Sequence, residues 1–413
     1  MNLFKKTLII FFYILLIIYS LEIFTNFFIK EKKNLTVTNI DKLKIEAINK
    51  IPNFDKRKDF QAFNEEKKNH DIYPSFRLSI DTINKNTYLK NFLKEKIFKK
   101  KKIPFRGPIN KMSLGSNEEG LREIIYNDKY GFKNYNKVYQ KDIDLMIIGD
   151  SFAEGVPFGN NYDVSGIINL NSNFNSINYG VSGTGPLHSL GVLTEYGKYF
   201  KPRNVFYFFY EGNDLRDLIL EKNTFLKSYL EDNFSQNLFN SELEIKFFLN
   251  DFEELFFEYI LDEMIKKENN SVIVKINKNS FIEIFKDIIE LQNLKRVLIP
   301  KDAYLYKNKK LDYDTFEKSI IKMNQIVDNW GGKFHLVYLP SWSRYNNNLS
   351  FTHKFFKNKI KKITKRNNID MIDMDYFFKK KKLDNANLFN LGIYGHYTQE
   401  GYKILADKIL DNM

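Results

Sequence analysis

Residues 143–152 read IDLMIIGDSF, an apolar run that ends in a glycine, an aspartate and the hydroxyl of Ser151. Short continuous apolar runs are typical of strands buried on both faces of a parallel sheet. In such sheets ligands bind beyond the carboxyl ends of the strands, so a serine directly after the run would face a substrate. Gly149 and Asp150 would also suit an ordinary turn, so the assignment depends on what lies downstream.

Strand patterns and helix patterns alternate from about residue 140 onward. This alternation predicts an α/β fold, in which a parallel sheet is covered by helices on both faces. The stretch 220–310 is longer than one crossover requires and carries Phe, Glu and Lys at helical spacing, so we expect a helical insertion there. The predicted strands are 143–148, 176–179, 204–210, 333–339 and 369–372, and the predicted helices are 163–169, 186–200, 281–297, 313–330, 353–366 and 398–410.

The next two predicted strands also end in residues that suit a reaction site. Residues 178–185 read NYGVSGTG and residues 210–215 read YEGNDL. If both strands belong to the same parallel sheet, their ends bring a glycine backbone N–H and an asparagine side-chain amide to the edge that carries Ser151. A hydroxyl nucleophile with preorganised donors for a developing oxyanion is the equipment of acyl transfer.

A serine nucleophile also needs a base, and the chain has five histidines. His396 lies in a loop that leads into the last predicted helix, and Thr398 is the expected N-cap of that helix. A histidine in a loop at the start of a helix can project its ring into a cleft. His335 lies inside a predicted strand and is expected to be a core residue. His188 opens a helix near Gly183 and is a lesser candidate.

The order Gly-Asp-Ser, Asn-x-Gly-x-x-Gly, Gly-Asn-Asp and a late histidine resembles the SGNH (GDSL) hydrolase family, over residues 143–410. The resemblance implies a three-layer α/β/α, flavodoxin-like parallel sheet. It also implies that Ser151 and His396 are catalytic and that Gly183 and Asn213 form the oxyanion hole. The upstream stretch NDKYGF at 127–132 resembles a bacterial subgroup of the family, many of whose members belong to cell-surface polysaccharide contexts.

The sequence departs from the family pattern at two positions. Glu211 stands where the third block often has glycine, and Ile393 stands where the family usually has an aspartate, three residues before the histidine. That carboxylate normally orients the imidazole and stabilises its charged form. The sequence therefore predicts a Ser–His dyad with no assigned carboxylate. Asp384 is the candidate orienting residue, with Asp373 and Asp375 also near in sequence.

The N-terminus contains an apolar segment, residues 7–29, which includes LIIFFYILLII at 8–18. A helix of this length can span a hydrocarbon core of roughly 30 Å. No alanine precedes Ala47, so the small-residue cleavage site of a signal peptide is missing. We expect a signal anchor in the bacterial inner membrane, a juxtamembrane extension over 30–139, and an extracytoplasmic hydrolase-like domain over 140–413.

Composition excludes several other classes. The chain of 413 residues has no cysteine, which rules out disulfides, a thiolate nucleophile and Cys-based metal sites. A net charge of +13 is compatible with nucleic-acid binding, but the sequence contains no helix-turn-helix, zinc-binding or RNP-like pattern. Phosphate-binding, dinucleotide-binding and His-Glu-x-x-His motifs are also missing. We expect no nucleic-acid partner, metal or cofactor, and we assign the charge to proximity to lipid headgroups or an anionic glycan.

These observations lead to two hypotheses. The first is a serine-dependent esterase or O-acyltransferase that acts on ester-linked acyl groups, such as acetyl, of a cell-surface glycan. The second is a catalytically decayed protein on the same scaffold that binds glycan or assists polysaccharide assembly. Intact Ser151, Asn213 and His396 favour the first hypothesis, whereas Ile393 favours the second.

Overall fold

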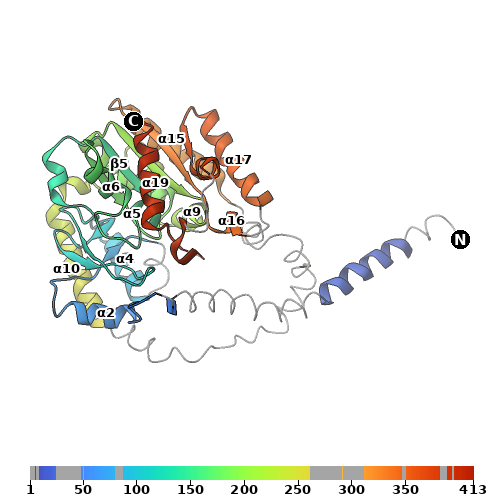
Figure 1. Ribbon diagram of the computed structural model, residues 1–413, viewed down its shortest axis with the longest axis horizontal. Coiled ribbons are helices and arrows are strands. Elements are labelled where there is room, and N and C mark those ends of the chain that lie inside the picture. Colours follow the sequence, from blue (N-terminus) through green and yellow to red (C-terminus); the bar gives the residue numbers. More distant parts are fainter. Residues whose placement is uncertain are drawn as a thin grey trace.

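The computed structural model describes residues 9–24, 51–79, 87–260, 311–346, 350–381, 388–392 and 395–413, together with a few isolated positions. At its centre lies a five-stranded sheet with the strand order β6-β5-β7-β8-β9, and all neighbouring strands in it are parallel. Figure 1 shows this sheet with helices packed around it. The predicted α/β architecture with a parallel sheet is confirmed.

The five strands agree with the predicted strands to within two residues at each end. Four of them, β5 to β8, are buried along almost their whole length, as expected of a parallel sheet whose two faces are both covered, whereas the edge strand β9 is buried only at Ile372. In the register of the sheet, Gly149 at the end of β5 pairs with Gly180 at the end of β6. The strands are β5 (Leu145–Gly149), β6 (Ser176–Gly180), β7 (Asn204–Tyr210), β8 (Lys333–Leu339) and β9 (Asp370–Asp373).

Side chains alternate between the two faces of the sheet and build a separate core on each. On β5, Met146 and Ile148 join a cluster that includes residues of α7 (Pro186–Val192), α15 (Tyr313–Asp328) and α17 (Ser350–Arg366). Leu145 and Ile147 join a second cluster, which includes residues of α6 (Val164–Asn171), α18 (Met374–Lys380) and α19 (Gln399–Leu410). The two helices α6 and α19 lie side by side (Figure 1). Together the sheet and the two sets of helices make three layers.

Residues 51–140 add small elements that pack into the first of these cores. Phe76, Phe105 and Phe132 belong to the same buried cluster as Met146 of β5. The extension therefore shares a hydrophobic core with the sheet. Its elements are α2 (Asp59–Glu66), β1 (Phe76–Arg77), α4 (Thr87–Phe98), β2 (Arg106–Gly107), β3 (Met112–Leu114), β4 (Ile124–Tyr126) and the 3-10 helix Asn136–Gln140, with antiparallel pairs β1–β2 and β3–β4.

The remaining elements connect the strands or belong to the insertion. The described part of the predicted insertion, up to residue 260, is mainly helical, whereas the predicted helix 281–297 lies almost wholly outside the described residues. The connecting elements are α5 (Ser151–Glu154), the π-helix Leu193–Gly197, α8 (Lys198–Phe200), α9 (Asp214–Glu221), α16 (Ser343–Asn346) and the 3-10 helix Asn390–Gly392. The insertion contains the 3-10 helices Phe225–Leu230 and Leu238–Asn240, α10 (Glu242–Leu255) and the π-helix Phe256–Ile260.

The predicted membrane anchor, residues 7–29, is described over 9–24, which form a helix. Within the part of the chain that the structure describes, no helix has both the length and the apolar character needed to cross a bilayer. The remaining residues of the segment 7–29 lie outside the described residues, so the anchor stays a prediction from the sequence.

Candidate active site

Ser151 begins α5 directly after β5, at the edge where the parallel strands end. Asp150 is the N-cap of this short helix, and its carboxylate accepts a hydrogen bond from Phe152 N at 2.9 Å. Gly149 has a φ of 144° and Gly155 a φ of 75°, both in the region that favours glycine. The two glycines let the chain turn sharply before and after the helix, so that Ser151 stays partly exposed at the strand end.

His396 contacts the serine from a loop 245 residues further along the chain. Its Nε2 lies 2.6 Å from Ser151 Oγ. The loop is held in place by a bridge between Phe389 and Tyr397 and by a hydrogen bond from Asn390 N to His396 O at 2.9 Å. The structure thus brings together the serine and the histidine that the sequence singled out, within the distance needed for proton transfer.

The other ring nitrogen of His396 faces Glu118, a residue of the N-terminal extension. Nδ1 lies 2.9 Å from each carboxylate oxygen of Glu118. Oε2 of the same carboxylate also accepts from His396 N at 3.3 Å and from Asn390 Nδ2 at 3.1 Å. Burial opposes ionisation of Glu118, but the hydrogen bonds and charge of His396 outweigh it and lower the pKa of the carboxyl to about 2. A carboxylate at this position fixes the tautomer in which Nε2 can accept the serine proton.

Glu118 corrects the expectation of a dyad without an assigned carboxylate. The candidate orienting residue Asp384 lies outside the described residues, as does Ile393. Sequence reasoning missed Glu118 because it searched for the carboxylate near the histidine, whereas Glu118 lies 278 residues before it. The local signal was the turn-forming stretch NEEG at 117–120, where Asn117 Oδ1 accepts from Gly120 N at 2.9 Å. Nothing in that stretch points to position 396.

Gly183 and Asn213, the candidate oxyanion donors, follow the two strands that flank β5. Gly183 has a φ of 75°, and a Cβ added there would lie 3.3 Å from Ser79 Cβ. Asn213 occupies the N-cap position of α9, and its Nδ2 donates to Asp217 Oδ2 at 2.9 Å. The Asn213 amide also interacts with the buried Asp150 carboxylate, so the two aspartates fix the orientation of its side chain.

A buried ion pair supports the loop that carries Gly183. Glu154, at the end of α5, contacts Arg106 Nη2 at 2.9 Å and Arg77 Nη2 at 3.1 Å, and it accepts from Ser182 N at 2.7 Å. Burial favours the protonated form of Glu154, but the two arginines outweigh it and hold the pKa of the carboxyl well below its usual range. The arginines come from β1 and β2, so the extension helps to position this loop.

Further buried carboxyl groups lie around the same strand ends. Burial raises the pKa of Asp150 to about 6 and that of Glu221 to about 8. Glu221 accepts from Gly185 N at 2.6 Å and from Leu187 N at 2.9 Å, which fixes the far end of the Gly183 loop. Both carboxyl groups are therefore protonated more readily than their solvent-exposed counterparts.

The other two histidines considered from the sequence lie in packed surroundings. His188 is buried against Phe105, with ring centroids 4.8 Å apart, and burial lowers its pKa to about 3. His335 lies in β8, where its Nε2 is 3.0 Å from Asn204 Oδ1. Both are therefore core residues, as the sequence indicated for His335.

No family model and no curated protein matches the chain. Among solved structures, similarity is found to a member of the lipolytic G-D-S-L family from Veillonella parvula, with 12% identity and a TM-score of 0.34. That match covers 65% of this chain and 97% of the other. A second similar structure is the acetylxylan esterase Axe2 from Geobacillus stearothermophilus, with 13% identity, a TM-score of 0.34, and coverage of 65% and 92%. A third is TesA, with 10% identity, a TM-score of 0.34, and coverage of 65% and 96%.

Proposed function

We propose that this protein is a serine-dependent esterase or O-acyltransferase of the SGNH type. The observation that carries the proposal is the line of contacts from Ser151 Oγ to His396 Nε2 and from His396 Nδ1 to Glu118. A nucleophile, a base and a carboxylate that orients the base are the three parts that activate a serine hydroxyl.

In the proposed reaction Ser151 Oγ attacks the carbonyl carbon of an ester while His396 Nε2 takes the hydroxyl proton. The carbonyl oxygen becomes an oxyanion, which the N–H groups of Ser151 and Gly183 and the amide of Asn213 stabilise. The intermediate collapses to an acyl-serine as His396 gives its proton to the leaving alkoxide. Glu118 stays ionised throughout and stabilises the imidazolium.

The acyl group then passes from Ser151 to a second nucleophile. If the second nucleophile is water, deprotonated by His396, the product is a carboxylic acid and the protein is an esterase. If it is a sugar hydroxyl, the product is an acylated sugar and the protein is an O-acyltransferase. We propose an ester-linked acyl group of a carbohydrate, such as acetyl, as the substrate. The sequence resemblance to a subgroup found in cell-surface polysaccharide contexts supports this choice.

The alternative, a catalytically decayed glycan-binding scaffold, depended on the missing aspartate at position 393. Glu118 meets the same chemical requirement from another part of the chain. We therefore favour an active enzyme.

Hydrolysis of p-nitrophenyl acetate by the wild type and by Ser151→Ala tests the proposal. We expect the substitution to lower the rate by at least about a thousandfold, because the nucleophile is lost. Ser172→Ala, a change at the end of α6, is the matched control and should keep the wild-type rate. Equal rates for wild type and Ser151→Ala would refute serine catalysis.

A second assay separates hydrolysis from transfer. The protein is given an acetyl donor and an unmodified oligosaccharide, and the acetyl content of the oligosaccharide is followed by mass spectrometry. Acetyl groups that appear on the sugar indicate a transferase, and their absence together with free acetate indicates an esterase.

The location of the protein stays a prediction from the sequence. The apolar segment 7–29 favours the bacterial inner membrane with the catalytic domain on the extracytoplasmic side. Alkaline phosphatase fused to the C-terminus, which is active only outside the cytoplasm, would test this. An inactive fusion would contradict it.

A further inference from the structure

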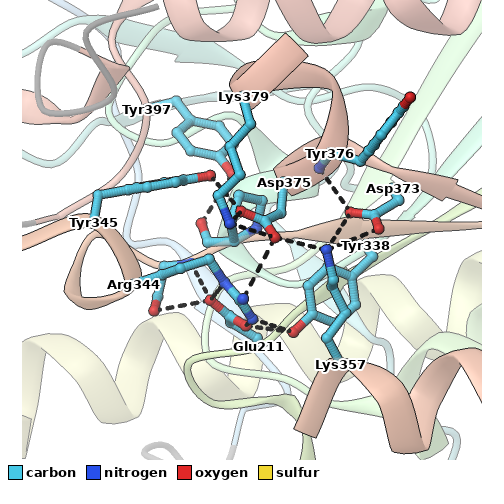
Figure 2. A network of polar contacts seen from close by, with 12 residues as sticks. Glu211, Tyr338, Arg344, Tyr345, Lys357, Asp373, Asp375, Tyr376, Lys379 and Tyr397 are labelled. Atoms are coloured by element: carbon cyan, nitrogen blue, oxygen red, sulfur yellow. Dashed lines mark hydrogen bonds and ion pairs between the residues drawn. The ribbon is translucent and has the colours of Figure 1, made fainter. Parts of the chain in front are cut away.

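Glu211, one of the two departures from the family motif, directly follows β7 and forms a buried ion pair. It lies two residues before Asn213, and its side chain is fully shielded from solvent. Its carboxylate accepts from Arg344 Nε at 2.9 Å and also contacts Arg344 Nη2, so the flat guanidinium meets both oxygens (Figure 2). Ser341 N donates to the same carboxylate at 2.7 Å, and the Tyr338 hydroxyl donates to it as well. The Glu211 carboxylate thus binds groups of β8 and of the segment that directly follows it.

Arg344 is itself fixed from several sides. Its Nη2 donates to the Tyr338 hydroxyl at 3.0 Å, and its Nη1 lies 3.4 Å from Asp375 Oδ2. Asp375 also accepts from Lys357 at 2.6 Å and from the Tyr345 hydroxyl at 3.3 Å (Figure 2). The guanidinium therefore has one defined orientation.

The segment 340–345, which Glu211 and Arg344 hold, also contacts the loop of His396. Pro340 O accepts from the Tyr397 hydroxyl at 3.1 Å, and Trp342 Nε1 donates to Gly392 O at 3.1 Å. Tyr397 directly follows His396, and its ring centroid lies 5.0 Å from that of Phe152, the neighbour of Ser151. One segment thus connects the turn of Asn213 with the loop of His396.

A contribution to stability does not explain why a charge pair is buried here. Replacing a buried ion pair by well-packed apolar side chains is often neutral or stabilising. A two-pronged arginine–carboxylate contact instead fixes direction as well as distance. Geometry matters here because a displacement of about 1 Å in a reacting group can cost roughly 10²-fold in rate.

We propose that Glu211 and Arg344 are positioning residues that hold Asn213 and His396 in their places relative to Ser151. The inference rests on the proposed function and deepens it. It assigns a purpose to a glutamate that the family motif does not contain.

The first test compares Arg344→Lys with the wild type, because lysine keeps the charge and loses the planar fork. We expect kcat for p-nitrophenyl acetate to fall about 10- to 100-fold, with KM within about twofold, since the geometry of the reacting groups is disturbed. The matched control is Arg366→Lys, because Arg366 of α17 makes the same two-pronged contact with Glu317 of α15 at the surface. We expect the control to keep its kcat. An unchanged kcat in Arg344→Lys would overturn the proposal.

A double-mutant cycle distinguishes positioning from general loosening. If Arg344 acts through Asn213, then Arg344→Lys should cost much less in an Asn213→Ala background than in the wild type. Losses that simply multiply would overturn the inference. Should Arg344→Lys fail to fold, Tyr397→Phe removes only the hydroxyl that reaches Pro340 and is expected to lower kcat several-fold, whereas an unchanged kcat would count against the link.

The failure of this inference can be told apart from failure of the proposed function. If the wild type hydrolyses the ester no faster than Ser151→Ala, the proposed function fails. The positioning of Asn213 can then still be tested through the NMR chemical shift of its side-chain amide. A shift of that signal in Arg344→Lys and none in Arg366→Lys supports the positioning role. An unshifted signal in both variants overturns it.

Discussion

At the scale of single residues, the identity of Glu118 decides how the histidine works. Glu118→Gln keeps the size of the side chain but offers an amide where Nδ1 needs an acceptor with a full charge. We expect kcat to fall by a factor on the order of 10³ to 10⁴, with little change in KM, because the imidazolium loses its stabilising partner and the tautomer is no longer fixed. Steady-state kinetics on p-nitrophenyl acetate measures this. Glu123→Gln, a change of a nearby carboxylate that accepts from Gly159 N, is the control and should affect kcat far less.

The same residue also gives a pH dependence of known sign. The pKa of Glu118 is lowered in the folded protein, from an ordinary value of 4.5 to about 2. Its ionised form therefore stabilises the fold above about pH 4.5, and this contribution is lost as the pH falls toward 2. In thermal unfolding, the wild type should have a higher Tm than Glu118→Gln at pH 6, and the two Tm values should become equal near pH 2. A gap that stays constant with pH would contradict the assignment.

At the scale of elements, the close contact between α5 and the end of β6 fixes the nucleophile. A Cβ added to Gly180 would lie 2.2 Å from Glu154 N, so only a glycine lets the helix approach. We expect Gly180→Ala to destabilise the fold by about 1–3 kcal/mol and to lower the esterase rate at least tenfold, because α5 must move with Ser151. Gly331→Ala is the control. An alanine at the φ of 80° found there costs about 1 kcal/mol, but its Cβ would meet open space and the position lies far from α5. Equal losses of activity in the two variants would argue against the contact.

At the scale of the whole molecule, buried charges connect the N-terminal extension to the sheet. Arg106 is fully buried and faces Glu154. Removing Arg106 leaves the buried Glu154 with the partly exposed Arg77 as its arginine partner, so we expect Arg106→Met to lower the free energy of unfolding by up to about 3–5 kcal/mol. Chemical denaturation measures the change. Arg203→Met, which removes an exposed arginine 3.5 Å from Asp144, should change it by less than about 1 kcal/mol.

The extension is thus part of the site and of the core at once. It supplies Glu118 to the histidine and Arg77 and Arg106 to the helix that begins with Ser151. Its aromatic side chains lie in the same cluster as the central strand. Esterase activity is therefore expected to depend on residues 51–139 as well as on the sheet.

By itself the sequence determined the sheet, the helices around it and the positions of Ser151 and His396. Each of these follows from short-range patterns: continuous apolar strands, amphipathic helices, and polar residues directly after strand ends. Such patterns depend on neighbours in the chain, and strand boundaries agreed to within two residues for that reason.

Only the tertiary structure decided which carboxylate faces the histidine and which side chain pairs with Glu211. Glu118 and His396 are 278 residues apart, and Glu211 and Arg344 are 133 apart. Pairs of this kind have no local periodicity, because a charge finds its partner through the packing of whole elements. The sequence could locate the reacting groups, whereas the fold alone determined what holds them in place.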